Sequence, residues 1–172
     1  GRLRWTELRS QLTTWGERSA EIVLASDLSD RRRAEQRLLR LNQVLTSLGN
    51  EFRENVEKLT AACGELLGAT CALYNRLDDG TLRTIGEWQA PADLQRADTP
   101  DGHVCFDVIR RGDTDRSLVV RNLQDTPYAR TDANVARYGL RTYAGHPVTL
   151  AGRTIGSLCV LYQSDRALDE SD

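Results

Sequence analysis

The sequence lacks the segments that would place it in or across a membrane. Its longest uninterrupted apolar stretches, residues 22–25 and 158–162, are far shorter than the roughly 20 residues that span a bilayer. The first residues include no apolar stretch that could serve as a signal peptide. We therefore expect a cytoplasmic location and no membrane contact by this segment.

Metal ligands and catalytic motifs are scarce. The chain has two histidines and four cysteines, and no two cysteines form a C-x-x-C pair, so a closed zinc site is not expected and the thiols should be reduced. There is no Gly-rich phosphate loop, no H-E-x-x-H motif, and no Ser, His and acid grouping in a motif context. The sequence therefore indicates no metal and no catalytic residue, and it names no cofactor.

A strong charge of either sign is also absent. The formal net charge is -2, and Lys58 is the single lysine. A protein that binds nucleic acid through bulk charge would be markedly basic, so no nucleic-acid partner is expected. Apolar residues make up 40% of the 172 residues and charged residues 28%, which is typical of one globular domain, or of one domain and a fragment of another.

Residues 1–28 predict two strands joined by a turn at residues 14–17. Residues 3–8 alternate apolar and polar side chains, and residues 20–25 form a short β-branched run. An isolated hairpin cannot hide an apolar face. We therefore expect these strands to complete a sheet that begins upstream.

A helix is predicted from residue 29, where Ser29 can act as the N-cap. Apolar residues then recur at alternating spacings of four and three, which favours a parallel two-stranded coiled coil. One amphipathic helix packed on its own domain would show a similar pattern over so short a span. We interpret residues 29–50 as a linker helix of a homodimer, with helical character continuing to residue 67. The seam residues are Ala34, Leu38, Leu41, Leu45, Leu48 and Phe52.

Residues 51–172 predict a second, α+β domain. Thr131 can cap a short helix at residues 132–138, and another short helix follows Thr99 and Pro100. The last predicted strand is apolar on both faces, as a central strand would be. We expect an antiparallel sheet of five to six strands, with helices on one face and a layer of loops and short helices over the other, where a ligand could sit. The strands are expected at residues 71–77, 81–88, 117–121, 141–150 and 153–162.

Several motifs together resemble a GAF domain preceded by the C-terminal end of a PAS domain. Residues 27–35, DLSDRRRAE, are similar to the D-I-T-E-R-K-x-x-E signature with which PAS domains pass into a signalling helix. Residues 139–143 with 145–148, and then 152–160, resemble the closing hairpin of GAF domains. The GAF family usually adds a C-terminal helix that this chain does not include.

The resemblance implies a non-catalytic sensory domain of a signal transduction protein of the histidine kinase type. Such a domain would bind an unidentified small molecule. The signal of binding would pass through the dimeric linker helix to an output domain in the same chain. Two alternatives stay open: a purely structural dimerisation module, and a thiol-dependent free methionine sulfoxide reductase in which Cys71, Cys105 and Cys159 converge. The reductase is the weaker alternative, since no sequence feature indicates a depressed thiol pKa.

Ligand contacts are expected from aromatic and polar residues on elements around the cavity. Aromatic residues are also ordinary core, His146 can be a satisfied structural histidine, and two ligands such as His103 and Cys105 do not make a metal site. A covalent bilin is not expected, because bilin-binding relatives have cysteine followed directly by histidine. Which face of strand 141–150 lines the pocket is open. The candidate residues are Trp88, His103, Cys105, Phe106, Tyr128, Tyr143 and His146.

Overall fold

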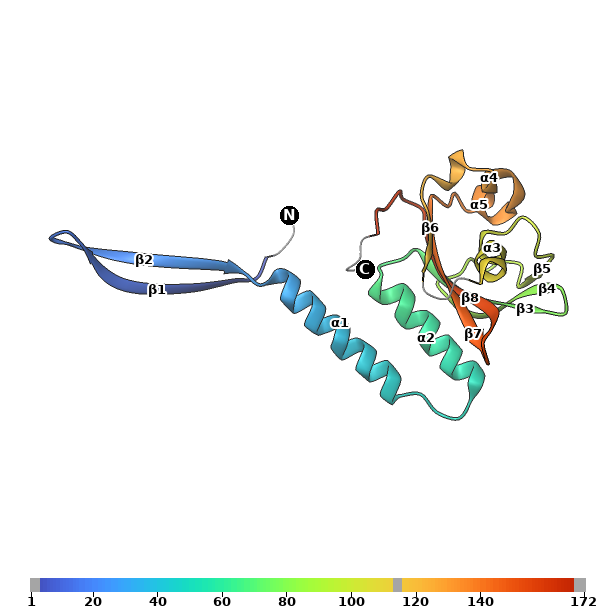
Figure 1. Ribbon diagram of the computed structural model, residues 1–172, viewed down its shortest axis with the longest axis horizontal. Helices are drawn as coiled ribbons and strands as arrows, with labels where there is room; N and C mark the ends of the chain where they lie inside the picture. Colours follow the sequence, from blue (N-terminus) through green and yellow to red (C-terminus); the bar gives the residue numbers. More distant parts are fainter. Residues whose placement is uncertain (1–3, 113–115, 169–172) are drawn as a thin grey trace. The chain divides into compact units, whose positions relative to one another are not determined.

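The computed structural model describes residues 4–112 and 116–168, which divide into a unit ending at Thr46 and a unit beginning at Ser47. In the first unit, β1 (Thr6–Trp15) and β2 (Arg18–Asp27) form an antiparallel hairpin (Figure 1). Gly16 has a φ of +64°, which suits the tight turn between the strands. The strands are longer than the sequence pattern indicates.

The hairpin leaves apolar side chains of both strands in solvent. Leu12 is 80% exposed, and Leu8, Ile22 and Leu24 are each more than half exposed. Within this unit, nothing in the described residues covers either hairpin face. The hairpin therefore has no apolar core of its own within the described residues of this unit.

The first helix, α1, spans Ser29–Thr46 and is tied to the hairpin at its start. The Trp5 backbone N–H donates to Ser29 Oγ over 2.9 Å, and the Ser29 N–H donates to Asp27 Oδ1 over 2.9 Å. The Arg32 guanidinium lies over the Trp5 ring, 4.3 Å from its centroid. Hydrogen bonds and a cation–π contact thus fix the point where strand gives way to helix.

The predicted continuous helix is interrupted, which corrects part of the seam. Helix α1 ends at Thr46 and α2 begins at Phe52, so Leu48 lies between helices. The Asn55 side chain holds the intervening backbone: its Oδ1 accepts the Gly49 N–H over 2.9 Å, and its Nδ2 donates to the Gly49 carbonyl over 2.8 Å. The seam residues that share α1 are Ala34, Leu38, Leu41 and Leu45.

The second unit is built on a six-stranded antiparallel sheet in the order β5-β4-β3-β8-β7-β6. The α+β expectation is therefore confirmed, with β8 between β3 and β7 as a central strand. The two-residue strand β5 lies in a segment that the sequence pattern assigns to a polar loop. The strands are β3 (Cys71–Asp78), β4 (Thr81–Trp88), β5 (Ala97–Asp98), β6 (Leu118–Val120), β7 (Thr142–Leu150) and β8 (Arg153–Tyr162).

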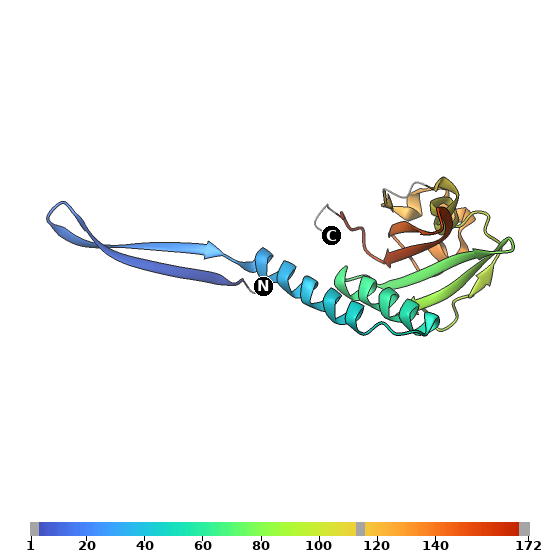
Figure 2. The same ribbon diagram turned by 60° about the horizontal axis from the view of Figure 1, so that its bottom comes forward.

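Different elements cover the two faces of the sheet (Figures 1 and 2). Helix α2 (Phe52–Leu66) packs on β3 and β4, over a small apolar cluster that includes Ala72 and Val160. A layer of short elements covers the other face and encloses the larger core. This layer consists of α3 (Val104–Arg111), a 3-10 turn (Leu123–Asp125), α4 (Tyr128–Thr131) and α5 (Ala133–Arg137). Among the described helices, none has the length and apolar character to span a bilayer.

Candidate functional site

A cavity of about 90 Å³ lies between the sheet and the layer of short elements. Its floor includes Leu73 and Cys159 from two neighbouring strands, and its cover includes Val104 and Val135 from α3 and α5. These side chains are almost fully buried and belong to one apolar core cluster. The space is several times what one water molecule needs, so a compact organic molecule could enter it.

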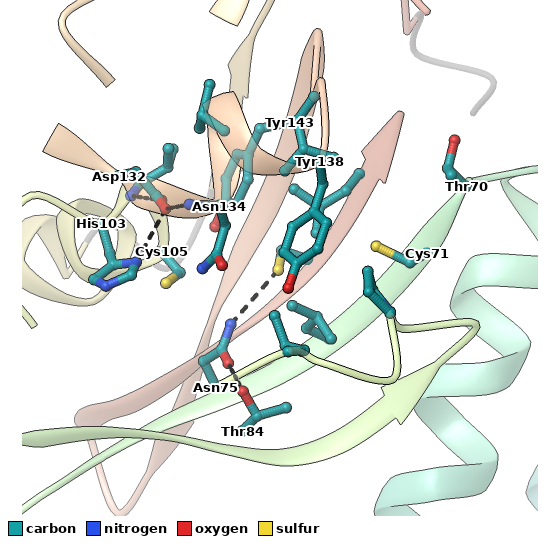
Figure 3. A pocket seen from close by; sticks show the side chains of 18 of the residues that line it. Thr70, Cys71, Asn75, Thr84, His103, Cys105, Asp132, Asn134, Tyr138 and Tyr143 are labelled. Atoms are coloured by element: carbon teal, nitrogen blue, oxygen red, sulfur yellow. Dashed lines mark hydrogen bonds and ion pairs between the residues drawn. The ribbon is translucent and has the colours of Figure 1, made fainter. Parts of the chain in front are cut away.

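A histidine and two carboxylates line one end of the cavity. Figure 3 shows two of these residues, His103 and Asp132. His103 Nδ1 lies 3.3 Å from Asp132 Oδ1, and His103 Nε2 lies 3.4 Å from Asp98 Oδ2. The contact with Asp132 raises the pKa of His103, although burial of the imidazole opposes the effect. The site therefore favours an imidazolium held between two acids.

Asp132 also holds the two helices of the cover together. Its Oδ2 accepts the Val104 N–H at the start of α3 over 3.2 Å, and its Oδ1 accepts the Asn134 N–H in α5 over 3.1 Å. His103 is itself the N-cap residue of α3 but makes no side-chain cap bond. One buried carboxylate thus satisfies backbone donors from both helices. It, rather than the expected Thr131, caps α5.

Asn75 provides a second polar group on the cavity floor. Its Oδ1 accepts the Thr84 hydroxyl over 2.8 Å, and its Nδ2 lies 3.8 Å from the Cys159 sulfur, a weak acceptor. Nearby, Tyr143 Oη and Ser157 Oγ are 3.1 Å apart. Figure 3 shows the Asn134 side chain pointing into the space between Asp132 and Asn75. Amides from two sides of the cavity therefore line the space.

Cys71, Cys105 and Cys159 all line the cavity, and all three are free thiols. Burial raises the pKa of Cys71 to about 11 and that of Cys105 to about 12. Burial also raises the pKa of Cys159. A nucleophilic cysteine needs thiolate at neutral pH, and these environments disfavour it.

Three of the seven candidate residues line the cavity: His103, Cys105 and Tyr143. The structure shows which face of β7 lines the cavity: it is the face of Tyr143, which pairs with Leu161 in β8. His146 is on the other side of β7, exposed, with Nδ1 3.1 Å from Ser117 Oγ. Successive side chains of a strand point to opposite faces, so His146 does not share the face of Tyr143. The expectation that His146 contacts the ligand is corrected.

The other three candidates also lie away from the cavity. Trp88 packs beneath α2 on the opposite face of the sheet, in the cluster with Ala72. Phe106 is half-buried on α3 and is turned away from the face that Cys105 presents to the core. The Tyr128 hydroxyl donates to Asp107 Oδ2 over 2.6 Å. The prediction of an aromatic wall from these residues is therefore wrong.

The sequence reasoning missed the two carboxylates and the amides. Asp98 lies in a two-residue strand that is too short to have a pattern of its own, and Asp132 stands beside Thr131, which is also a residue type that caps helices. The run Thr131-Asp132 before a short apolar helix was the available signal for a cap. The choice between the two residues depends on contact with α3, which is distant in sequence.

Comparisons with known proteins agree on the family. The profile of the GAF domain matches residues 51–172. No curated protein matches the sequence.

Solved structures share the fold at low sequence identity. A GAF domain from a phosphoenolpyruvate-protein phosphotransferase of Coxiella burnetii has a TM-score of 0.65 at 12% identity, covering 83% of this chain and 84% of that chain. The free methionine-R-sulfoxide reductase of Neisseria meningitidis, solved with its substrate, has a TM-score of 0.64 at 18% identity, covering 83% and 80%. A domain assigned to a two-component sensor histidine kinase of Sinorhizobium meliloti has a TM-score of 0.57 at 22% identity, covering 72% and 81%. The profile match spans well over half of the sequence, and the chain belongs to the GAF domain family.

Proposed function

We propose that this chain is a sensory module whose GAF cavity binds a small molecule and whose linker helix relays the occupancy to an output domain such as a histidine kinase. The cavity carries the proposal. It combines buried apolar walls with a few convergent polar groups, the arrangement typical of small-molecule sites. The similar reductase was solved with its substrate, which supports small-molecule binding by this fold.

The cover of the cavity provides a means of response. Asp132 accepts backbone N–H groups at the starts of both α3 and α5. A ligand that contacts Asp132 therefore affects the positions of both helices. A molecule that binds one arrangement of these helices better than another shifts their equilibrium. A coupling of about 1 to 3 kcal/mol is typical of such sites.

The first unit is proposed to carry the relay. The exposed hairpin is interpreted as the end of a PAS domain, and α1 as one strand of a parallel coiled coil in a homodimer. Leu38 is 62% exposed, Leu41 41% and Leu45 55%, so α1 offers apolar side chains at the predicted seam positions. The similarity to a domain assigned to a sensor histidine kinase favours this type of output.

Ligand binding is tested by a thermal-shift screen of small amines, alcohols, cyclic nucleotides and nitrate against the whole chain. The variant Asn134→Trp places bulk in the cavity, because the Asn134 side chain points into it. Ala136→Trp adds the same bulk to an exposed position of α5 and serves as the control. A ligand of the cavity should stabilise the wild type and the control but not Asn134→Trp.

The screen also separates the alternatives. If no compound stabilises the wild type, the purely structural module is the better interpretation. A reductase would reduce free methionine sulfoxide and lose this activity in Cys105→Ser. The raised thiol pKa values argue against that activity.

A further inference from the structure

Acidic groups outnumber basic groups around the cavity. Asp98 and Asp132 contribute two carboxylates, and His103 is the basic group between them. Among the described lining residues there is no lysine and no arginine. The Arg137 guanidinium, beside the lining residue Tyr138, lies over the Tyr138 ring and is paired with Asp93. Even with His103 protonated, two acids face one cation, so one negative charge stays uncompensated.

The carboxylates keep acceptor capacity toward the cavity. Asp98 Oδ1 accepts the Thr99 N–H over 2.7 Å, while Oδ2 has the His103 contact at 3.4 Å, longer than a strong ionic hydrogen bond. The side chain of Asp98 is 39% exposed and that of Asp132 is 9% exposed. The Asn134 amide, which points into the same space, has no hydrogen-bond partner among the described residues. A donor group on a ligand would find oxygen acceptors at this end of the cavity.

The other walls have a different character. Leu73, Leu82, Leu94 and Leu161 line the space with apolar carbon, and each is less than a tenth exposed. A molecule in the cavity can therefore place a polar group at the Asp98 and Asp132 end and hydrocarbon against these leucines. The volume of about 90 Å³ limits it to a compact molecule.

We propose that the cavity selects a compact aliphatic amine, with its ammonium group at the Asp98 and Asp132 end and its hydrocarbon part against the leucines. This inference rests on the proposed ligand-binding function. An ammonium group supplies the missing positive charge and donates up to three hydrogen bonds. A carboxylate or phosphate would be brought beside two like charges in a partly desolvated space, which costs binding free energy.

The test compares three ligands of one shape: isopentylamine, isopentyl alcohol and isovalerate. Each is titrated into the whole chain at pH 7, and binding is followed by amide NMR shifts of cavity residues. We expect the amine to bind about tenfold tighter than the alcohol or more, and isovalerate to bind more weakly than either. In Asp98→Asn, which keeps an oxygen for the Thr99 N–H, the amine should lose about tenfold in affinity while the alcohol is unchanged. Asp101→Asn, an exposed carboxylate outside the lining, is the control and should behave as the wild type.

The outcomes distinguish this inference from the proposed function. Equal or tighter binding of the alcohol or isovalerate overturns the preference for an amine. The preference is also overturned if all three probes fail to bind while another compound, uncharged or anionic, shifts the same amide signals. That shift must be absent in Asn134→Trp, which shows that the compound binds in the cavity. In both cases the ligand-binding function stands. If no compound binds in the cavity, the function and the inference fail together.

Discussion

His103 Nδ1 and Asp132 Oδ1 lie 3.3 Å apart, and this contact joins the first turn of α3 to the first turn of α5. Both side chains are less than a tenth exposed, so water does little to screen the pair. The cover of the cavity is therefore held by this buried His103–Asp132 contact and by the two backbone N–H groups that donate to Asp132.

Removing the Asp132 carboxylate should destabilise the domain. Asp132→Ala leaves the N–H groups of Val104 and Asn134 without their acceptor and leaves His103 with one acid instead of two. Loss of the cap costs about 0.5 to 2 kcal/mol, and leaving His103 without its main buried partner adds to this, so a total of about 3 kcal/mol or more is expected. The free energy of unfolding, measured in urea, should fall by this amount. Asp101→Ala at an exposed position is the control, and an equal loss there would refute the role of Asp132.

Stability should also depend on pH through His103. Its pKa is raised in the folded state, chiefly by Asp132, with Asp98 on the other side of the ring. The native state then binds more protons than the unfolded state, so the free energy of unfolding falls as pH rises. The contribution is complete below the unfolded pKa of about 6.5 and is lost as pH rises through the folded value. Urea titrations from pH 6 to 9 measure the slope.

Variants of the two histidines identify the source of that slope. His103→Gln should reduce it, whereas His146→Gln should retain it because His146 is exposed. A slope that persists unchanged in His103→Gln would assign the titration to another group.

The cavity thiols should be unreactive in the folded protein. Burial raises the pKa of Cys71 to about 11 and of Cys105 to about 12, and the thiolate is the reactive form. Ellman's reagent at pH 7.5 should therefore modify these cysteines far more slowly than a free thiol, and at the free-thiol rate in denaturant. Rapid modification of Cys105 in the native protein, located by peptide mapping, would contradict this and revive the reductase alternative.

The sequence pattern predicted where the strands of the domain lie better than which face of each strand is covered. The closing hairpin follows from Gly139 and Gly152, which have φ values of +61° and +76° and mark turns that glycine accommodates easily. Alternation along β7 separates Tyr143 from His146 but does not say which side is covered. That information comes from β8 and from the layer of short elements, which are contacts distant in sequence.

Trp88 illustrates how a local irregularity reverses a face. In β4, Thr84 pairs with Asn75 of β3 and points to the cavity. Two residues later in β4, Gly86 pairs with Tyr74, which is only one residue from Asn75 in β3. The extra residue, Ile85, forms a bulge that turns the rest of the strand over. Trp88 therefore faces α2, where simple alternation from Thr84 would place it in the cavity.

The break between α1 and α2 has a similar origin. The apolar spacing of four and three continues from Leu45 through Leu48 to Phe52, so the pattern alone favours one helix. The two hydrogen bonds between the Asn55 side chain, which accepts one and donates the other, and the Gly49 backbone replace the helical ones. A spacing rule for apolar residues does not include such a polar competitor.

The packing of α2 on Trp88 gives a further test. A Cβ on Gly64 would overlap the Trp88 ring, so Gly64→Ala forces the ring or the helix to move. Overpacking of this kind costs about 1 to 3 kcal/mol, more than the gain of up to about 1 kcal/mol from alanine's helix propensity. Thermal unfolding should show a net loss. In Gly49→Ala a Cβ meets nothing within 4 Å, so this control should lose no stability, and an equal loss there would refute the steric argument.

The proposed dimer depends on apolar side chains that α1 exposes. Leu41 and Leu45 are 41% and 55% exposed, so changing both to aspartate removes little of the core of a single chain but places charges in the seam of a coiled coil. Multi-angle light scattering should then show the wild type near twice the chain mass of 19.3 kDa and the double variant near that mass. Helicity by circular dichroism confirms that the variant is folded.

The matched control places the same charges outside the seam. Gln36 and Gln43 are exposed and lie on the side of α1 opposite Leu38 and Leu45 in a two-stranded coil. Gln36→Asp with Gln43→Asp should therefore leave the dimer intact, since charge alone does not decide association. Dissociation of both double variants would indicate general repulsion between the chains. A dimer that survives Leu41→Asp with Leu45→Asp would remove α1 as the relay, because the association would then depend on another surface.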